Sequence, residues 1–481
     1  MDPKKENHPD IRAFIRKRLS RRESYGLRFT IGIAASAFFA FLFAALAQDV
    51  IARESLVAAD IRIMNLAVVL REFGLARVFL FITYLGNWQS IVSVGILILL
   101  ILGLQGERRK ARYLFVAVLA GELLYSIFKI LMHRPRPDIS FSLFPQTGYA
   151  FPSGHAVVPL VFYGMIAFFL RRTVRKRRYR ALIAAGAATF VFLIGYSRIY
   201  LGVHWASDVI AGWALGAAIL LCAASLFRAR EKSSPEIKQS ITVPRAALIP
   251  AVTFLVFLEG VFAVYFYATH PLRVEAVQAH GITVIAPPDT IESIIQGGNF
   301  PKFSETLTGE KMEPVSLIIV GSKDELTAAF KEAGWMTADI WGVRTLLRMG
   351  GAAIDNAPYP AAPVTPSFLN AEPETIAFQK ATEKNSPRER HHARFWLTQY
   401  RFGSRPVWVA TASFDEEIRY LITHKIDPNI DAERDFIKTE LEGTKSVDAL
   451  RQIQLVQPLR GKNQIGYEFF TDGKAYIMAL K

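Results

Sequence analysis

The chain has 481 residues, of which 51% are hydrophobic, and it carries a net charge of +15. The positive mean hydropathy excludes a wholly soluble protein and predicts a membrane domain beside at least one other domain. Residues 1–268 hold 33 Lys+Arg and 15 Asp+Glu, whereas residues 269–481 hold 24 and 27. Membrane topology explains a basic excess in the apolar half better than nucleic-acid binding does, although a lipid-head-group-binding N-terminus also fits. A single cysteine, Cys222, excludes an intrachain disulfide and a cysteine-rich metal site.

Seven apolar segments are about long enough to cross a bilayer, which takes roughly 20 residues. They are residues 29–47, 78–104, 113–131, 156–170, 181–197, 208–227 and 247–268. The fourth and fifth are short, so we expect their helices to extend into the flanking residues. The first ends in Ala45-Leu46-Ala47, which resembles a signal-peptidase site, but the long basic leader favours an anchor that is retained.

Loop charges predict the orientation of these segments. Nine Lys/Arg precede the first segment, four follow the second in ERRKAR, and seven follow the fourth in RRTVRKRRYR. Because basic loops stay in the cytoplasm, we expect a multi-pass inner-membrane protein with a cytoplasmic N-terminus and a periplasmic C-terminal half. The expected organisation is a basic N-terminus (1–28), a membrane core (29–228), a cytoplasmic linker (229–246), a seventh transmembrane helix (247–268) and an extracytoplasmic domain (269–481).

Three polar stretches lie at the predicted outer ends of the third to sixth segments, where a helical bundle would bring them together. They are KILMHRPRP with Lys129 and Arg136, FPSGHA with Ser153, Gly154 and His155, and YSRIYLGVHWASDV with Arg198, His204 and Asp208. Singly, each has an ordinary explanation, such as a lysine reaching the interface, a loop arginine (Arg134 or Arg136) or a helix start. Jointly these explanations fail, because the outer loops are otherwise poor in Lys and Arg.

The histidines and the aspartate suit phosphoryl transfer without a metal. His204 and Asp208 are four residues apart, so they share a face if a helix begins by about residue 204. A carboxylate bonded to one ring nitrogen leaves the other nitrogen free to attack phosphorus. His155 would then protonate the leaving oxygen and later activate water.

The remaining residues suit binding of the phosphate itself. Lys129, Arg136 and Arg198 would neutralise the phosphate oxygens, and an arginine can bind two of them at once. Ser153 and Gly154, at a predicted helix start, would add a hydroxyl and backbone N–H donors.

The pattern as a whole resembles the three-part signature of the type 2 phosphatidic acid phosphatase (PAP2) superfamily. The matching positions are Lys129-x6-Arg136-Pro137, Pro152-Ser153-Gly154-His155 and Ser197-Arg198-x5-His204-x3-Asp208, and the likeness covers about residues 60–228. It implies a six-helix core, a phosphohistidine on His204, acid–base catalysis by His155, and no metal or other cofactor. It also implies a lipid phosphate as substrate, with undecaprenyl pyrophosphate as first choice and phosphatidate, phosphatidylglycerol phosphate or lipid A as alternatives.

Two other functions fit parts of the same pattern. Vanadium haloperoxidases share the same constellation with vanadate in place of phosphate, but seven spans argue against them. A membrane-anchored binding or assembly protein with a vestigial core is the second, and the intact signature argues against it. Two acids inside predicted spans, Glu122 and Glu259, are functional candidates by position. We favour neutral or paired structural roles for both.

After residue 270 the pattern changes to that of an α/β or α+β domain. PVSLIIVGSKDELTAAFKEAGW predicts a strand, a capped helix and a glycine stop, and DAERDFIKTELEG predicts an amphipathic helix. RFWLTQYRFGSRPVWVATASF predicts a hairpin, and IGYEFFTDGKAYIMAL predicts a second strand pair turning at Asp472-Gly473. The stretches GSKDELTAAFKEAGW, RERHHARFWL and THKIDPNIDAERD resemble the LssY-type C-terminal domain, which implies no defined activity.

Several metal-ligating residue types gather in this C-terminal half. They are His391, His392, His424, Asp427 and Asp431. Adjacent histidines on a strand point to opposite faces, so His391 and His392 would rarely share one metal ion. We therefore favour structural polar contacts over a metal site.

Overall fold

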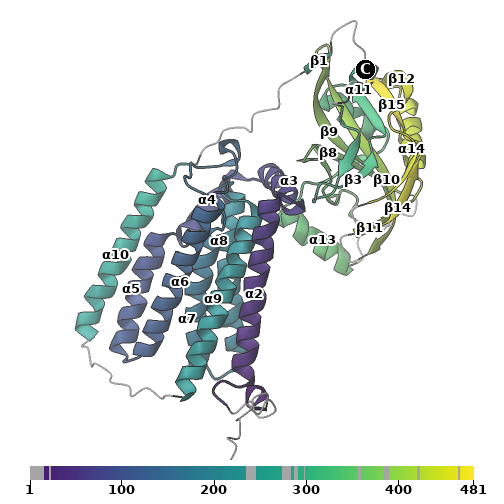
Figure 1. Ribbon diagram of the computed structural model, residues 1–481. Coiled ribbons are helices and arrows are strands. Elements are labelled where there is room, and N and C mark those ends of the chain that lie inside the picture. The colour runs from purple at the N-terminus through teal and green to yellow at the C-terminus, as the bar shows by residue number, and fades with distance from the viewer. Residues whose placement is uncertain are drawn as a thin grey trace, which may run out of the picture. The chain divides into compact units, whose positions relative to one another are not determined.

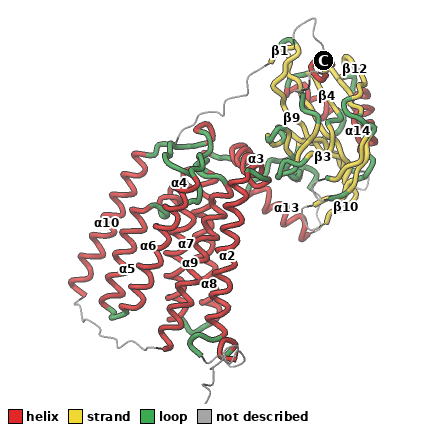
Figure 2. Tube along the Cα trace, in the orientation of Figure 1, coloured by secondary structure: helices red, strands yellow, loops and turns green. Residues whose placement is uncertain are grey.

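The computed structural model describes residues 16–20, 23–233, 245–272, 283–285, 291–296, 298, 300–355, 359–382, 389–419, 423–463 and 466–481. The chain divides into two compact units. A helical unit comprises residues 1–60 and 71–275, and a second unit comprises residues 61–70 and 276–481. Figure 2 shows helices filling the first unit and strands dominating the second. This agrees with the predicted fold class of a helical membrane bundle followed by an α/β or α+β domain.

Long apolar helices lie side by side in the helical unit (Figure 1). They are α2 (Leu27–Ala52), α5 (Trp88–Leu104), α6 (Arg108–Met132), α7 (Gly154–Thr173), α8 (Arg177–Tyr200), α9 (Ala206–Ser233) and α10 (Arg245–Thr269), and the shorter α4 (Phe73–Tyr84) precedes α5. Among the described residues five helices are long and apolar enough to cross a membrane, or six if α4 and α5 count as one span. The chain is therefore a multi-pass membrane protein. The predicted fourth and fifth segments lie within α7 and α8, which extend into the flanking residues.

One predicted segment is interrupted. The apolar run 78–104 forms two helices, α4 and α5, which meet at a bend of 47°. The break falls at Leu85–Asn87, and Gly86 lies so close to its neighbours that a Cβ there would come within 2.6 Å of Ile194 and 3.1 Å of His155. The break thus brings backbone against the first turn of α7, which an unbroken helix could not do. Hydropathy averaged over the run does not show this, although the break coincides with the polar residues Asn87, Gln89 and Ser90.

A helix that the sequence does not predict, α3 (Ser55–Val69), lies between the first two apolar segments. Small residues then set the spacing of the helices around the site. A Cβ on Gly212 of α9 would come within 2.7 Å of Ala156 and 2.8 Å of the Ser153 carbonyl oxygen of α7. The Ser153 N–H donates to the Asp208 carbonyl oxygen at 2.9 Å. The start of α7 and the first turn of α9 are therefore in direct backbone contact.

A mixed sheet forms the core of the second unit. Its path runs β12 (Val447–Gln454), β15 (Lys474–Leu480), β4 (Leu317–Val320), β10 (Arg405–Arg419), β9 (Arg390–Phe402), β8 (Ile376–Ala381) and β5 (Met336–Thr337), with β1 (Thr283–Ile285) on β9 and β11 (Thr423–Ile426) on β10. Helices α12 (Lys323–Glu332) and α14 (Ile430–Gly443) contribute buried side chains to the core that includes Leu317, Phe395 and Trp408.

Smaller elements complete this unit. They are α11 (Ile291–Gln296), α13 (Val343–Asp355), the sheet of β2 (Phe303–Glu305), β3 (Lys311–Pro314), β6 (Phe368–Leu369) and β7 (Glu372–Pro373), and the pair β13 (Leu459–Lys462) and β14 (Glu468–Thr471).

Most local predictions for this unit are confirmed, and one is wrong. Ser322 caps α12 through a reciprocal capping box with Glu325, and β9 and β10 form the predicted hairpin. The chain does turn at Gly473, which has φ of +73°. The flanking strands do not pair with each other, however, because β14 pairs with β13 while β15 joins β12 and β4. Alternation predicts strands here but cannot choose their partners.

Candidate active site

The candidate nucleophile and its partner lie at the start of α9. His204 and Asp208 are 1% and 0% exposed, and the His204 Nδ1 atom lies 3.2 Å from Asp208 Oδ2. The helix α9 begins at Ala206, two residues later than a shared helix face would require, so His204 lies in the preceding loop. The contact forms nevertheless, since the Trp205 N–H also donates to Asp208 Oδ2 at 2.9 Å and so tightens the turn.

The other ring nitrogen of His204 faces the half-buried guanidinium of Arg136. Arg136 Nη1 lies 3.0 Å from His204 Nε2 and donates to the Val203 carbonyl oxygen at 2.7 Å, while Arg136 Nε donates to the Gly148 carbonyl oxygen at 3.0 Å. Backbone oxygens from two loops therefore hold Arg136 in place. Burial lowers the pKa of Arg136 to about 10, which leaves it charged at neutral pH.

Further cations converge on the same point. Arg198 is 1% exposed, donates to Thr83 Oγ1 at 2.7 Å and bonds Gln146. Lys129 lies at the end of α6, with its amine 5.5 Å from the centre of the Tyr125 ring. Burial lowers the pKa of the His204 imidazole well below its ordinary value, and the positive charges of Arg136, Arg198 and Lys129 lower it further. At neutral pH His204 is therefore uncharged, the form in which a ring nitrogen can attack.

Two buried donors near these cations have no hydrogen-bond partner within the described part of the chain. They are Arg198 Nε and Ser153 Oγ. Ser153 is the residue before α7, yet its hydroxyl does not cap that helix. Buried donors without partners are rare, and both are available to oxygens of a bound phosphate.

His155, in the first turn of α7, is held by the break between α4 and α5. Its Nε2 atom lies 2.5 Å from Asn87 Oδ1. Because the amide oxygen can only accept, Nε2 carries the proton of the neutral ring, and Nδ1 is left for proton exchange. Neither Asn87 nor Thr83 was singled out from the sequence.

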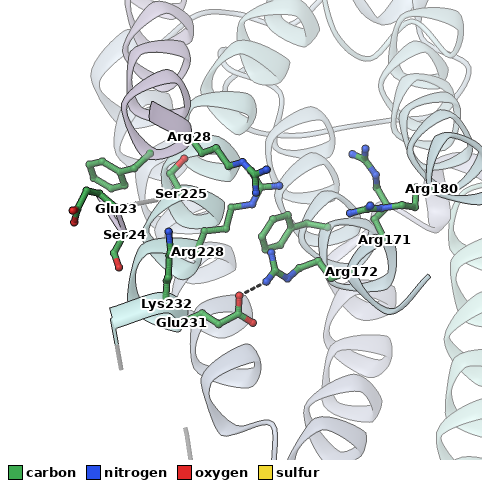
Figure 3. Close-up of a pocket in the computed structure, with 12 residues that line it drawn as sticks. Glu23, Ser24, Arg28, Arg171, Arg172, Arg180, Ser225, Arg228, Glu231 and Lys232 are labelled. Carbon is green, nitrogen blue, oxygen red and sulfur yellow. Dashed lines mark hydrogen bonds and ion pairs between the residues drawn. The ribbon is translucent and has the colours of Figure 1, made fainter. Parts of the chain in front are cut away.

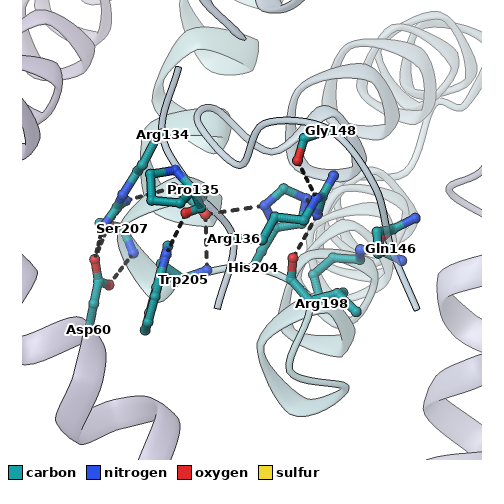
Figure 4. A network of polar contacts seen from close by, with 12 residues as sticks. Asp60, Arg134, Pro135, Arg136, Gln146, Gly148, Arg198, His204, Trp205 and Ser207 are labelled. Carbon is teal, nitrogen blue, oxygen red and sulfur yellow. Dashed lines mark hydrogen bonds and ion pairs between the residues drawn. The ribbon is translucent and has the colours of Figure 1, made fainter. Parts of the chain in front are cut away.

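Arg134, Asp60 and Ser207 form a second group of polar contacts next to the site (Figure 4), and Arg134 links it to Asp208. Arg134 Nη1 donates to Asp208 Oδ1 at 2.6 Å, and Arg134 Nη2 donates to Asp60 Oδ2 at 2.6 Å. Asp60 also accepts from the Ser207 N–H at 2.9 Å. All four side chains are buried, so Arg134 bridges two carboxylates away from water. Arg134 is therefore not an ordinary loop charge, because it binds two buried carboxylates. Its only signal in the sequence is the Arg134-Pro135 pair directly before Arg136-Pro137.

The two acids within the predicted spans have hydrogen-bond partners. The Tyr125 hydroxyl donates to Glu122 Oε1 at 2.7 Å, on the same ring that lies under Lys129. Glu259 in α10 accepts a hydrogen bond from Ser93 in α5. Each acid therefore has a polar partner on a helix of the bundle, as a paired structural role requires.

The histidines of the second unit take separate partners. His391 Nδ1 lies 2.8 Å from Glu433, whereas His392 Nε2 contacts Ser413 Oγ at 2.9 Å and its Nδ1 lies 3.3 Å from Asp415 Oδ2. A cavity of only about 50 Å³ adjoins the His392 group, enough for a water molecule or two. Asp431 accepts from Arg434 and Thr471. The Asp427 carboxylate accepts from the Asn429 N–H, and the His424 side chain lies outside the described residues.

Comparison with known proteins places the two halves of the chain in separate families. Residues 110–232 match the PAP2 superfamily, and residues 298–475 match the LssY C-terminus family. Phosphatidylglycerophosphatase B of Bacillus subtilis is 30% identical over 179 residues, which cover 37% of this chain and 87% of that protein. Lipid A 1-phosphatase of Rhizobium johnstonii is 36% identical over 24% of this chain and 47% of that protein. Undecaprenyl-diphosphatase of Sulfolobus acidocaldarius is 35% identical over 21% and 45%.

The chain thus belongs to the PAP2 superfamily, and its C-terminal half carries an LssY-type domain. The matched residues 110–232 include all three signature stretches. Asp60, Thr83 and Asn87 lie before that range, on α3 and around the α4–α5 break, yet each contacts a residue of the candidate site.

Proposed function

We propose that this protein is an integral membrane lipid phosphatase that releases phosphate through a phosphohistidine on His204. The observation that carries the proposal is the environment of that imidazole. Its Nδ1 faces Asp208, its Nε2 faces Arg136, and burial and cations keep it uncharged. A neutral ring with one nitrogen held by a carboxylate and the other beside an anion-binding group is arranged for nucleophilic attack on phosphorus.

The first step forms a bond from His204 Nε2 to phosphorus and breaks the bond to the leaving oxygen. Arg136, Arg198 and Lys129 stabilise the charge on the remaining phosphate oxygens. Ser153 Oγ and the backbone at the start of α7 add neutral donors. Asp208 accepts a hydrogen bond from the Nδ1–H group and so stabilises the positive charge that the ring gains.

His155 moves the protons of both steps. With the negative charge of the substrate phosphate bound beside it, His155 takes up a proton at Nδ1 and gives it to the leaving oxygen, which departs as an alcohol or a phosphate. The neutral ring then takes a proton from water, and the resulting hydroxide attacks phosphorus and breaks the bond to His204 Nε2. Inorganic phosphate leaves, and His155 is protonated again. Asn87 keeps the His155 ring oriented throughout.

The orientation proposed for the membrane follows from charge. The site lies at the ends of α6 and α8 and the starts of α7 and α9, whereas basic residues concentrate at the opposite ends of these helices. Because basic ends face the cytoplasm, we place the site and the C-terminal domain on the periplasmic side of the inner membrane. Undecaprenyl pyrophosphate is our first candidate substrate. Phosphatidylglycerol phosphate is the second, because the relative named for it matches over 87% of its length.

Phosphate release by the purified full chain tests the proposal. The substrates are undecaprenyl pyrophosphate, phosphatidate, phosphatidylglycerol phosphate and lipid A, each with and without excess EDTA. We expect release from at least one lipid, unaffected by EDTA, and a loss of at least about a thousandfold in His204→Ala. His392→Gln, which changes a buried histidine in the other unit, is the matched control and should keep full activity. Release that persists above a few per cent in His204→Ala would remove the nucleophile assignment. No release from any lipid would favour a binding or assembly role.

A further inference from the structure

A second charged cavity lies at the opposite ends of the helices from His204 (Figure 3). Its volume is about 500 Å³, and it is bounded by the start of α2, the end of α7, the start of α8 and the end of α9. The cations that line it are Arg28, Arg171, Arg172, Arg180, Arg228 and Lys232. It shares no residue with the candidate active site.

Topology explains why this end of the bundle is basic, but it does not explain why these side chains meet. The positive-inside rule concerns the number of cations in a loop and not their direction. Here arginines at four helix ends line one cavity. The charge of Arg228 is opposed by four other arginines of the cavity, which are Arg28, Arg171, Arg172 and Arg180. Like charges so close together repel, so the arrangement favours a bound anion.

The acids at the cavity do not cancel this charge. Among the described lining residues six are cations and two, Glu23 and Glu231, are acids, which leaves an excess of four positive charges. Glu231 pairs with Arg172, as the dashed line in Figure 3 shows. In Figure 3 the guanidinium groups of Arg28 and Arg228 point into the cavity from one side, and the Arg180 side chain extends into it from the other.

An aromatic wall orients two of the guanidinium groups. Arg228 lies 4.9 Å and Arg172 lies 5.5 Å from the centre of the Phe168 ring. A guanidinium that packs on an aromatic ring keeps its N–H groups free at the edge, where they can bind two oxygens of one phosphate. Phe29 and the hydroxyls of Ser24 and Ser225 also line the cavity. It therefore combines apolar surface with phosphate-binding groups.

We propose that this cavity binds a phosphate-bearing anion, supplied either by the head group of an anionic phospholipid or as free phosphate. Basic pockets between helices at the cytoplasmic side of a membrane bind anionic head groups in this way. The cavity lies at helix ends, the depth at which lipid phosphates occur, and the aromatic wall suits the glycerol and upper acyl chain. The site is distinct from that of His204, which lies at the other ends of α7, α8 and α9.

A binding experiment on the full chain in neutral detergent tests this site. The probes are dihexanoyl phosphatidylglycerol, a phosphodiester without the terminal phosphate that the His204 site needs, and inorganic phosphate. Binding is followed by the rise in unfolding temperature with probe concentration. We expect Arg180→Gln/Arg228→Gln to weaken binding roughly 30-fold, at about 1 kcal/mol for each charge removed.

Two control variants locate the effect. Arg175→Gln/Arg177→Gln removes the same charge from the same end of the bundle, on residues that do not line the cavity, and should bind like the wild type. Arg136→Gln changes the His204 site and should also leave phosphatidylglycerol binding intact. Binding of the lipid alone identifies the head group as the ligand. Equal binding of inorganic phosphate identifies the free anion, provided that Arg180→Gln/Arg228→Gln loses it and Arg136→Gln, which weakens phosphate binding at the His204 site, keeps it. Equal losses in both charge-neutralised pairs, or no binding by the wild type, would overturn the proposal.

Discussion

The two units each bury a histidine beside an aspartate, and only the surroundings differ. His204 Nδ1 lies 3.2 Å from Asp208, and His392 Nδ1 lies 3.3 Å from Asp415. Both histidines are at most 2% exposed. The Nε2 atom of His204 faces the Arg136 guanidinium, whereas that of His392 faces the hydroxyl of Ser413.

The comparison shows that a histidine–aspartate pair does not make a phosphate site by itself. Around His204, Arg136, Arg198 and Lys129 converge, and two buried donors have no partner among the described residues. Around His392 the nearby cavity measures about 50 Å³, too small for a phosphate ester. The pair orients an imidazole in both places. In the proposed mechanism the cations and available donors around His204 supply what phosphoryl transfer needs, and the described surroundings of His392 hold no such set.

The sharpest way to break this comparison is to make the same substitution in both pairs. We expect Asp208→Asn to reduce kcat for phosphate release by about a thousandfold or more, because the amide no longer stabilises the ring that carries the phosphoryl group. Asp415→Asn should leave kcat unchanged. Steady-state phosphate release measures both variants. Similar losses in the two would mean that the second unit takes part in catalysis.

The next largest fall in kcat is expected at Arg134, which bridges Asp208 and Asp60. Arg134→Gln leaves Asp60 and Asp208 buried without the charge between them, so we expect kcat to fall about 10- to 100-fold with little change in KM. Arg134→Lys should restore part of the rate. Asp60→Asn should lower kcat less in the Arg134→Gln background than in the wild type, since both act on Asp208 through one network. Additive losses would place Asp60 outside that network.

Smaller effects on kcat and KM are expected at two residues beside the α4–α5 break, Asn87 and Thr83, which contact His155 and Arg198. Asn87→Leu removes the acceptor that orients His155, so we expect a fall in kcat of about tenfold with KM unchanged. Thr83→Val removes a hydrogen bond from Arg198, which in the proposed mechanism binds the phosphate of the ground state as well, so KM should rise by a few fold. Substrate-saturation curves for the two variants give both constants. The opposite division between kcat and KM would contradict the assigned roles.

The signature residues could be predicted because their spacing encodes their chemistry. A histidine four residues before an aspartate, and an arginine seven residues after a lysine, are visible in one dimension. Asp60, Thr83 and Asn87 could not be predicted, because each reaches the site through packing between helices far apart in the sequence. The break that delivers Asn87 lies in an apolar run whose hydropathy predicts one continuous helix.

The second unit shows the same limit. The capping box of Ser322 and the β9–β10 hairpin follow from neighbouring residues, so the sequence predicts them. The strands on either side of Gly473 also form, but each pairs with a distant strand. Local pattern predicts the type of an element, and long-range packing chooses its partner.

The smallest predicted effect is the contribution of His392 to the pH dependence of the free energy of unfolding. Burial lowers the pKa of His392 to about 4, and Arg394 and Arg390 lower it while Asp415 opposes the shift. The unfolded chain, with its ordinary pKa of 6.5, binds the proton first as the pH falls. The stabilisation is therefore complete above that value and is lost as the pH falls toward 4. Between about pH 7.5 and 5.5 the second unit should lose about 1 kcal/mol of unfolding free energy through this residue.

His392→Gln, which cannot titrate, isolates that contribution. Denaturant unfolding of the full chain, followed by tryptophan fluorescence at both pH values, gives the loss for the wild type and for the variant. We expect the wild type to lose about 1 kcal/mol more than His392→Gln over this interval. Trp396 and Trp408, both at most 2% exposed in the same unit, report its unfolding. An equal loss in both proteins would mean that the folded unit protonates His392 as readily as the unfolded chain does, and the pair would then be more open to water than its burial indicates.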